Sequence, residues 1–296
     1  MPGFRSLLIL LAAFSLALPA AVAAPAHSPP RRIVSLNLCT DQLLIALADP
    51  AQIAALSPLA RDPALSFYAA RAHALPVTDG SMEELLALQP DLILAPPGRI
   101  SQGLAGLSRR RVATVDIDDA TRLDDIFGNI RAMAKAIGYP ARAEALIARM
   151  QRDIGRLQAA PSGRGRTAAY YQRRGYLTGQ GTLIDDLMTK AGLLNLSVKL
   201  GRPALSAIAL EEMVAAQPDF LIMDSEARFV VDRGTELLRH PALDNAVPQS
   251  QRLYLPAKLT VCGGPSYASA LAVLRAQIAA ADKRQGSDIR AAGGGR

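Results

Sequence analysis

One pattern of twelve residues occurs twice in the chain. Residues 83–94 and residues 211–222 are identical at six of the twelve aligned positions, and the other six positions are apolar in both copies. Each copy has the pattern of a short helix that begins with two glutamates, followed by a Gln-Pro-Asp break and a buried strand. Because the copies lie 128 residues apart, the repeat predicts two halves built on one plan.

Short apolar runs alternate with helical patterns around each copy of the repeat. Residues 32–36, 92–95 and 112–115 have the composition of short buried strands. Residues 81–88 have the serine cap and the acidic first turn that are typical of a helix. Strands and helices that alternate with short breaks favour parallel sheets. The predicted fold class is α/β, with two Rossmann-like lobes.

The middle of the chain has the apolar spacing of two helices, divided by Gly138 and Pro140. The second of these should be a long linker helix over about residues 141–158. The last segment is rich in glycine and charge, which predicts a disordered tail. The predicted boundaries are an N-terminal lobe at 31–120, a helical connection at 121–159, a C-terminal lobe at 166–281 and the tail at 282–296.

Residues 1–23 have the three parts of a secretion signal. Arg5 precedes an apolar run of 13 residues, and small residues end the segment. The alternative is an uncleaved anchor helix, which would need about 20 apolar residues to span a bilayer. No cysteine lies around the expected cleavage region, so no lipid anchor is predicted. We expect an exported, periplasmic protein.

The basic excess of the chain does not predict nucleic-acid binding. Lys and Arg number 33 against 26 Asp and Glu, but the basic residues are dispersed and only 4% of the residues are aromatic. A continuous basic stripe and a set of stacking platforms are both missing. The net charge fits instead an anionic small ligand or a nearby anionic membrane surface. We expect a monomer without a nucleic-acid partner.

Both cysteines of the chain, Cys39 and Cys262, lie in the expected mature protein. An oxidising compartment favours a disulfide between them. Two free thiols in separate places stay open as the alternative, because the sequence does not give the distance between their Cα atoms.

Four passages together give the chain a family resemblance. They are residues 32–36, residues 80–94, residues 181–187 with 191–195, and residues 211–222. On these passages, residues 31–280 resemble the periplasmic substrate-binding proteins that serve ABC importers of iron–siderophore complexes, haem and cobalamin. The resemblance implies two lobes joined by one long, rigid α-helix, with the ligand cleft between the lobes. It also implies a metal chelate as transported ligand, no resident cofactor, no catalysis, and an ABC permease–ATPase complex at the inner membrane as partner.

The resemblance also gives a role to one glutamate of each repeat. In this family an acidic residue on the outer face of each lobe docks onto arginines of the permease. It lies seven positions before the proline of the break, which corresponds to Glu83 and Glu211 here. The alternative is that these glutamates only favour the positive end of a helix, by roughly a few tenths of a kcal/mol each. The repetition of the placement favours docking.

Candidate ligand contacts follow from where open α/β sheets place their sites. Such sites lie at the carboxyl ends of the strands, so residues that follow predicted strands are the candidates. Arginine binds carboxylate, phosphate or hydroxamate oxygens through paired donors, and tyrosine covers apolar rings. Each arginine alone could also be a solvated surface residue. The predicted ligand contacts are Cys39, Thr40, Asp41, Arg99, Tyr171, Arg173, Arg174, Arg228, Cys262 and Tyr267.

Two other classes of protein have weaker support. A dedicated metal-ion site would need histidine and carboxylate ligands, and beyond the leader segment the only histidines are His73 and His240. An exported α/β enzyme could use Cys39 with a histidine, but no Gly-x-Ser-x-Gly nucleophile motif is present. The chain has no Trp, which weakens the case for cobalamin. Iron–siderophore complexes and cobalamin both stay open as ligands, with haem as the alternative.

Overall fold

Each half of the molecule contains one four-stranded sheet in which all neighbouring strands pair in parallel. The computed structural model describes residues 28–95, 112–160 and 162–293, so the predicted signal peptide lies outside the described residues. The N-lobe sheet has the spatial order β2 (Ile53–Ala55), β1 (Ile33–Ser35), β3 (Leu92–Ala95), β4 (Ala113–Asp116). The C-lobe sheet has the order β7 (Leu194–Asn195), β5 (Thr167–Tyr170), β9 (Phe220–Asp224), β10 (Arg252–Leu255). The predicted two-lobe α/β fold is confirmed.

The two copies of the sequence repeat end their helices in the same way. α3 (Met82–Leu88) and α10 (Leu210–Ala216) are both followed by a glutamine in the left-handed region, with φ of 45° at Gln89 and 41° at Gln217. A left-handed residue closes the last turn of a helix, and the proline after it cannot continue the helix. The break therefore sets the length of both helices.

The aspartate of each break ties the returning chain to the neighbouring strand. Asp91 accepts a hydrogen bond from the backbone N–H of Arg32 at 3.0 Å, just before β1. Asp219 accepts one from the backbone N–H of Thr167 at 2.8 Å, at the first residue of β5. The repeat thus encodes the same step from helix to parallel strand in each lobe.

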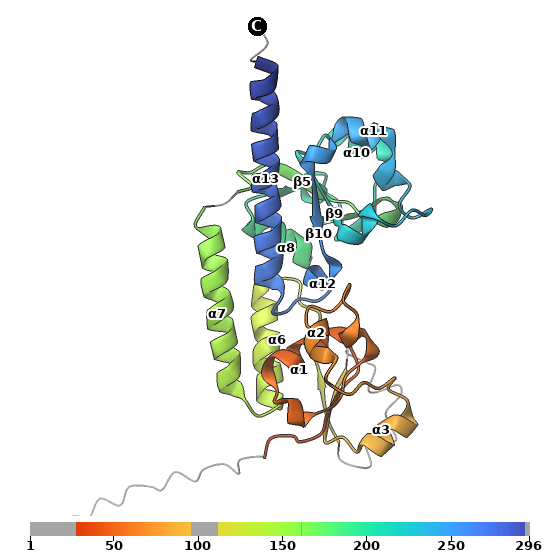
Figure 1. Cartoon of the computed structure of the whole chain (residues 1–296), viewed down its shortest axis with the longest axis vertical. Coiled ribbons are helices and arrows are strands. Elements are labelled where there is room, and N and C mark those ends of the chain that lie inside the picture. Colours follow the sequence, from red (N-terminus) through yellow and green to blue (C-terminus); the bar gives the residue numbers. More distant parts are fainter. Residues whose placement is uncertain (1–27, 96–111, 161, 294–296) are drawn as a thin grey trace, which may run out of the picture.

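Three long helices form one side of the molecule. These are α6 (Leu123–Ala136), α7 (Pro140–Gln158) and α13 (Tyr267–Gly293). α7 runs beside α6 and α13 and leads from the N-lobe to the C-lobe (Figure 1). Its buried side chains recur at helical spacing, and they are Ala143, Leu146, Ile147, Met150 and Ile154. One long helix therefore connects the lobes.

One hydrophobic core extends through both lobes. It includes Leu94 of β3, Ile222 of β9 and the buried faces of the three long helices. The segment around Gly263 lies very close to the N-terminal half, since a Cβ built on this glycine would be 2.6 Å from the Cβ of Ala120. A side chain at position 263 would force these segments apart, so glycine is required by packing.

Shorter helices cover the sheets. They are α1 (Leu38–Leu47), α2 (Ala69–Ala72), α8 (Leu183–Lys190), α9 (Leu196–Lys199), α11 (Pro241–Ala246) and α12 (Ala257–Thr260), with 3-10 turns that include η3 (Arg173–Gly175), η4 (Ser225–Arg228), η5 (Leu237–Arg239) and η6 (Gln249–Gln251). A small antiparallel pair, β6 (Tyr176–Thr178) and β8 (Leu205–Ala207), lies at the side of the C-lobe. None of the helices in the described ranges is both long and apolar enough to span a membrane.

The C-terminal segment differs from its sequence prediction. Residues 282–296 were expected to be disordered, but α13 continues through residue 293. Asp282 forms an ion pair of 2.5 Å with Arg166, and Arg284 donates a hydrogen bond of 3.0 Å to the carbonyl of Ser250. These contacts with the C-lobe hold the start of the segment in helical form, which its glycine-rich composition did not indicate.

One edge of the C-lobe sheet is covered by a side chain of α13. β10 is one of the two edge strands of this sheet, and β7 is the other. Gln277 accepts a hydrogen bond of 2.7 Å from the backbone N–H of Tyr254 in β10, and its amide donates to the carbonyl of the same residue. Both backbone polar groups of Tyr254 on this edge are therefore used.

Candidate functional site at the junction of the lobes

A disulfide joins the two lobes where they meet. Cys39 lies in the first turn of α1, directly after β1, and Cys262 follows α12, soon after β10. Their Cα atoms are 5.3 Å apart. Asn37 fixes the backbone on the N-lobe side by accepting a hydrogen bond of 2.7 Å from the N–H of Cys39. Because the bond connects segments that follow strands of different sheets, the carboxyl ends of the two sheets face each other.

The bonded cysteines have no free thiol with which to bind a metal. Across the part of the chain that the structure describes, no three His, Cys, Asp or Glu side chains gather into a group that could hold a metal ion. The chemistry available at the junction is therefore that of hydrogen bonds, charges and apolar surface.

A cavity of about 190 Å³ lies at the junction beside the disulfide. Both lobes contribute to its walls, which include Asn37, Cys39, Asp118, Leu183, Thr260 and Cys262. Pockets that enclose a drug-sized ligand are usually about 300–1,000 Å³. A chelate with a macrocycle or several chelating arms must therefore also contact the surfaces that border this cavity.

Thr40 and Asp41 lie inside the N-lobe and not at the junction. Both side chains are buried. The Thr40 hydroxyl donates to the carbonyl of Asn37 at 2.9 Å and lies 2.7 Å from the hydroxyl of Ser35. The Asp41 carboxyl accepts hydrogen bonds from the backbone N–H and the hydroxyl of Ser57, at 3.2 and 2.5 Å. These side chains attach α1 to the strand and loop beside it, and their role as ligand contacts stays a prediction.

The environment of Asp41 favours its protonated form. Burial raises the pKa of Asp41 to about 7, although hydrogen bonds from Ser35 and Ser57 act in the opposite direction. The N-lobe therefore contains a carboxyl group that titrates near neutral pH.

Tyr171 and Tyr267 are also internal. Tyr171 is fully buried and packs in a C-lobe core with Met213 and Leu221. Tyr267 is buried in the first turn of α13, and its hydroxyl donates a hydrogen bond of 2.5 Å to Asp186. Both rings are buried, and Tyr171 lines a small cavity of about 170 Å³ together with Arg173. A ligand contact of either tyrosine stays a prediction.

Two apolar side chains that the sequence analysis did not single out are exposed instead. Phe229 and Val231 lie in the loop after η4, at the carboxyl end of β9, and they are 74% and 76% exposed. Because the carboxyl ends of both sheets face each other, this loop lies on the junction side of the C-lobe. The sequence feature that could have indicated this exposed surface is the apolar run of residues 229–231, which lies between a predicted strand and charged residues.

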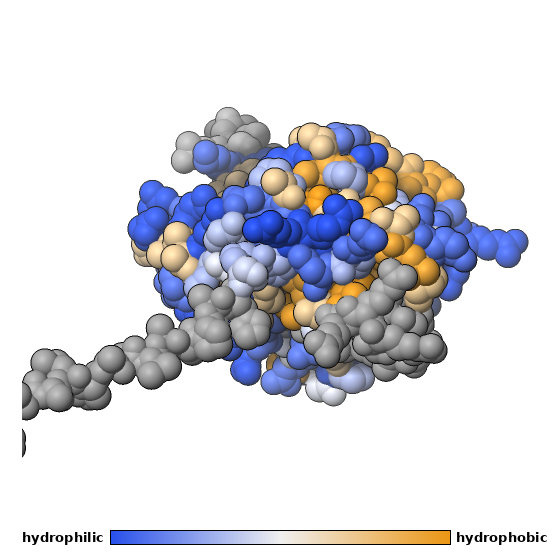
Figure 2. Space-filling model, turned by 90° about the horizontal axis from the view of Figure 1, so that it is seen from below, coloured by the Kyte–Doolittle hydropathy of each residue, from blue (hydrophilic) through white to orange (hydrophobic). Residues whose placement is uncertain are grey.

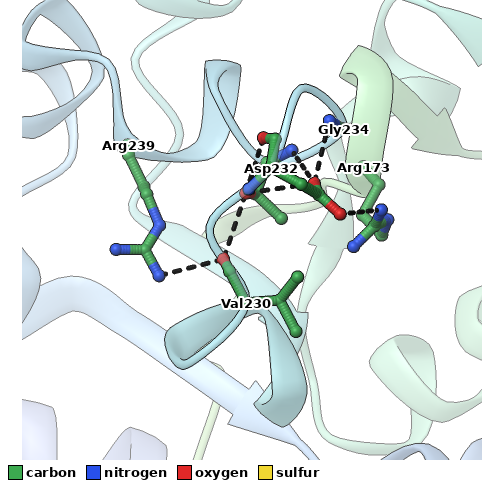
Figure 3. A network of polar contacts seen from close by, with 6 residues as sticks. Arg173, Val230, Asp232, Gly234 and Arg239 are labelled. Atoms are coloured by element: carbon green, nitrogen blue, oxygen red, sulfur yellow. Dashed lines mark hydrogen bonds and ion pairs between the residues drawn. The ribbon is translucent and has the colours of Figure 1, made fainter.

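Polar contacts hold this loop in one conformation (Figure 3). The carboxylate of Asp232 accepts hydrogen bonds from the backbone N–H of Gly234 at 2.9 Å and from the guanidinium of Arg173 at 2.6 Å. The Asp232–Arg173 contact is also an ion pair, which lowers the pKa of Asp232. Arg239 donates to the carbonyl of Val230 at 3.1 Å. The loop therefore presents its apolar side chains from a fixed backbone.

The predicted arginines do not form one cluster. Arg173 and Arg174 lie in η3, next to the loop, and the backbone N–H of Arg174 donates to the carbonyl of Gly234 at 2.7 Å. Arg228 stacks over the ring of Tyr254, with its guanidinium carbon 4.7 Å from the ring centre, and it lines a different cavity. Arg99 lies outside the described residues.

In each of the glutamate pairs that begin α3 and α10, the second glutamate contacts the protein and the first is exposed. Glu84 accepts hydrogen bonds from the loop before α3, and Glu212 forms an ion pair with Arg202. Glu83 and Glu211 are exposed, and neither has a salt bridge to any described residue. The second glutamate thus supports the fold, and the first is available to a partner.

Apolar surface lies on the same side of the molecule as α3. Leu86 of α3 is one of the exposed large hydrophobic residues. Seen from the N-lobe end, apolar residues gather toward the right of the molecule in Figure 2, which is the side of α3 in Figure 1. A surface that combines acidic and apolar side chains suits contact with another protein.

Comparison with known sequences gives a family and related proteins. The family described as periplasmic binding protein matches residues 33–259. The chain is 28% identical over 210 residues to the vitamin B12-binding protein of Pectobacterium carotovorum subsp. carotovorum (strain PC1), an alignment that covers 67% of this chain and 72% of that protein.

Solved structures have the same architecture. The periplasmic heme-binding protein RhuT from Roseiflexus sp. RS-1 has a TM-score of 0.67 and 26% sequence identity, covering 85% of this chain and 99% of that one. A protein of the ABC-type Fe3+-hydroxamate transport system from Saccharomonospora viridis DSM 43017 has a TM-score of 0.62 and 19% identity, covering 84% and 93%. This second likeness concerns the fold alone.

Proposed function

Since the chain belongs to the family of periplasmic binding proteins, we propose that it captures a metal chelate between its lobes and delivers it to the permease of an ABC importer. The arrangement of the junction is the main support. Two sheets present their carboxyl ends to each other across the Cys39–Cys262 bond, and the loop that follows β9 carries exposed apolar side chains. The family and the related structures are ligand-binding transport proteins and not enzymes, so no residue is given a catalytic role.

The family has a periplasmic location. We propose that residues 1–23 are a cleaved signal peptide, without a lipid anchor, and that the mature protein is a monomer. The disulfide agrees with this placement, since such bonds form and persist in oxidising compartments.

The surface at the junction suits a chelate with apolar parts and negatively charged groups. Phe229 and Val231 can cover a ring or a chelate face. Arg173 and Arg174 contact the same loop, Arg173 through its ion pair with Asp232 and Arg174 through its backbone N–H, so both are proposed to contribute positive charge beside it. Arg99, which is outside the described residues, remains a proposed contact from the N-lobe. The proposed ligand is an iron–siderophore complex or cobalamin. Haem is the second candidate, and the 26% identity to a heme-binding protein favours keeping it.

The ligand can be found by thermal unfolding of the purified mature protein against cyanocobalamin, haem and ferric catecholate and hydroxamate chelates, followed by circular dichroism. Ligand at a thousandfold excess over Kd that binds only the native state should stabilise it by about 4 kcal/mol. One chelate should raise the melting temperature clearly. If none of the four does, the proposed ligand class is wrong.

The same titration tests the loop after η4. Phe229→Ala should weaken binding of the identified chelate by about 10- to 100-fold, because burying a Phe side chain contributes about 1.5–3 kcal/mol. Leu194→Ala is a matched control, since Leu194 is 56% exposed on β7 and lies away from the carboxyl ends of the strands. Equal affinity of the Phe229→Ala protein and the control would remove the loop from the ligand site.

Docking onto the permease is proposed for Glu83 and Glu211. The double variant Glu83→Gln, Glu211→Gln should reduce chelate uptake by cells at least about tenfold, because ion pairs with hydrogen bonds at a protein interface contribute about 2–5 kcal/mol. Glutamine keeps the shape of the side chain, so the affinity for the chelate in solution should not change.

Glu236→Gln serves as the control for the docking variant, because Glu236 is also exposed on the C-lobe but lies outside both repeats. Uptake assays in cells and calorimetry on the purified proteins give the two readouts. Normal uptake by the double variant, or a loss of chelate affinity in solution, would contradict the docking role.

A further inference from the structure

A second and larger cavity lies in the C-lobe, away from the disulfide. It has a volume of about 760 Å³ and is bounded by η4, η5, α11, η6, the edge strand β10 and α13. Its charged lining residues are Arg228, Arg239, Arg252, Arg284 and Asp244. It contains neither Cys39 nor Cys262, and none of its walls comes from the N-lobe.

The one carboxylate among these lining residues is already paired. Arg252 is buried, and its guanidinium lies 2.7 Å from the carboxylate of Asp244. Arg252 also donates to the carbonyls of Val247 and Leu238, at 3.1 and 3.2 Å. Asp244 therefore balances the charge of Arg252, and neither Arg228 nor Arg239 forms a salt bridge with a described residue.

Arg239 is held in place without being neutralised. One of its terminal nitrogens donates to the carbonyls of Ala227, Arg228 and Val230, at 3.4, 2.9 and 3.1 Å. Carbonyl groups fix the direction of a guanidinium but carry no net charge. The remaining N–H groups of Arg239 have no hydrogen bond to another described residue.

Arg228 is positioned by an aromatic ring. Its guanidinium carbon lies 4.7 Å from the centre of the Tyr254 ring and 5.9 Å from that of Phe229. It forms no salt bridge with a described residue. A cation that stacks on a ring keeps its N–H donors free at the edge of the guanidinium plane, where an oxyanion can bind in a bidentate manner.

We propose that this cavity is a second binding site, for a ligand that carries a phosphate group. Arg228 and Arg239 come from the two ends of one short loop, and together they supply two positive charges. A phosphate monoester or diphosphate group carries about the matching negative charge near pH 7. The volume falls within the range of small-ligand pockets, so the phosphate can belong to a larger molecule. A soluble phosphate compound and a lipid headgroup share this chemistry.

The test uses the purified mature protein without chelate, at low ionic strength because salt screens exposed charges. Inorganic phosphate and pyrophosphate are titrated by calorimetry, and in parallel the protein is mixed with vesicles of phosphatidylcholine with and without phosphatidylglycerol. We expect saturable binding of pyrophosphate. Vesicle binding that requires phosphatidylglycerol would identify a lipid headgroup as the source, and pyrophosphate binding without it would identify a soluble ligand.

Variants locate the bound phosphate. Arg228→Ala should weaken binding at least tenfold, and Arg228→Lys should restore only part of it, since lysine keeps the charge but not the paired donors. Arg152→Ala on the exposed face of α7 is the control and should bind as the wild type does. Binding that is absent in every arm, or that Arg228→Ala leaves unchanged, would overturn the proposal. So would competition between pyrophosphate and the chelate, because that would place the phosphate at the junction.

Discussion

Replacing both cysteines with serine is expected to lower the free energy of unfolding by about 5 kcal/mol on the chain-entropy account of a cross-link. The bond between Cys39 and Cys262 spans a sequence separation of 223 residues, so it restricts the unfolded chain strongly. Because a typical domain is stable by only about 5–15 kcal/mol, this is a large share of the total. Urea unfolding at equilibrium, followed by circular dichroism, measures the difference.

A reducing agent offers an independent check of the same expectation. The chain has only two cysteines, so reduction acts on this one bond. Reduced wild type and the double serine variant should unfold at the same urea concentration, and the reducing agent should have no effect on the variant. A decrease below about 1 kcal/mol would show that the bond contributes little beyond the shared core of the lobes.

The second large effect is expected from pH, through Asp41. Its pKa is about 7 in the folded protein and close to 3.8 in the unfolded chain. The folded state therefore binds the proton more tightly, so this group stabilises the fold most below about pH 4, and the contribution is lost as the pH rises toward 7. At 1.4 kcal/mol per pKa unit, the loss is about 4 kcal/mol across this window. Asp41→Asn keeps a neutral side chain of the same shape and should remove this dependence.

Urea unfolding of wild type and variant at pH 4.5, 6 and 8 tests the assignment. The variant should become more stable relative to the wild type as the pH rises. Asp49→Asn is a control, because Asp49 is on the surface and its pKa is lowered, first by a hydrogen bond from Tyr139 and then by Arg142. Asp49 stays ionised across this range, so its replacement should not change the pH slope. Parallel slopes for the wild type and Asp41→Asn would mean that another group titrates.

The fold could be predicted because the same local sequence pattern determines the step from helix to strand in each of the two lobes. The Gln-Pro-Asp break stops a helix and starts a strand by chemistry that lies within a few residues, and the repeat shows that the same step occurs in each half. Parallel pairing of short buried strands then leaves few arrangements. The tail was the exception, since the contacts of Asp282 and Arg284 connect it to residues that are distant in sequence.

The site could be predicted only to the level of loops. Strand ends give the position of a residue along the chain, but the direction of its side chain depends on how the next helix packs. Cys39 lies at the junction, whereas Thr40 and Asp41, one and two residues later in the same helical turn, lie inside the N-lobe. Phe229 is exposed because Asp232 and Arg173 fix the loop around it, and that ion pair joins residues 59 apart in sequence.

The amide of Gln277 on the last strand also affects how the protein behaves beside copies of itself. The edge of a sheet offers unpaired N–H and carbonyl groups on which a strand of another molecule can assemble, and this is a common route to aggregates. At Tyr254 both groups are taken by one side chain of α13, in the middle of a strand of four residues. A strand of another molecule would have to displace the packed helix α13 before it could pair with β10 and extend the sheet. The C-terminal helix α13 thus opposes aggregation through strand pairing at the β10 edge of the C-lobe sheet.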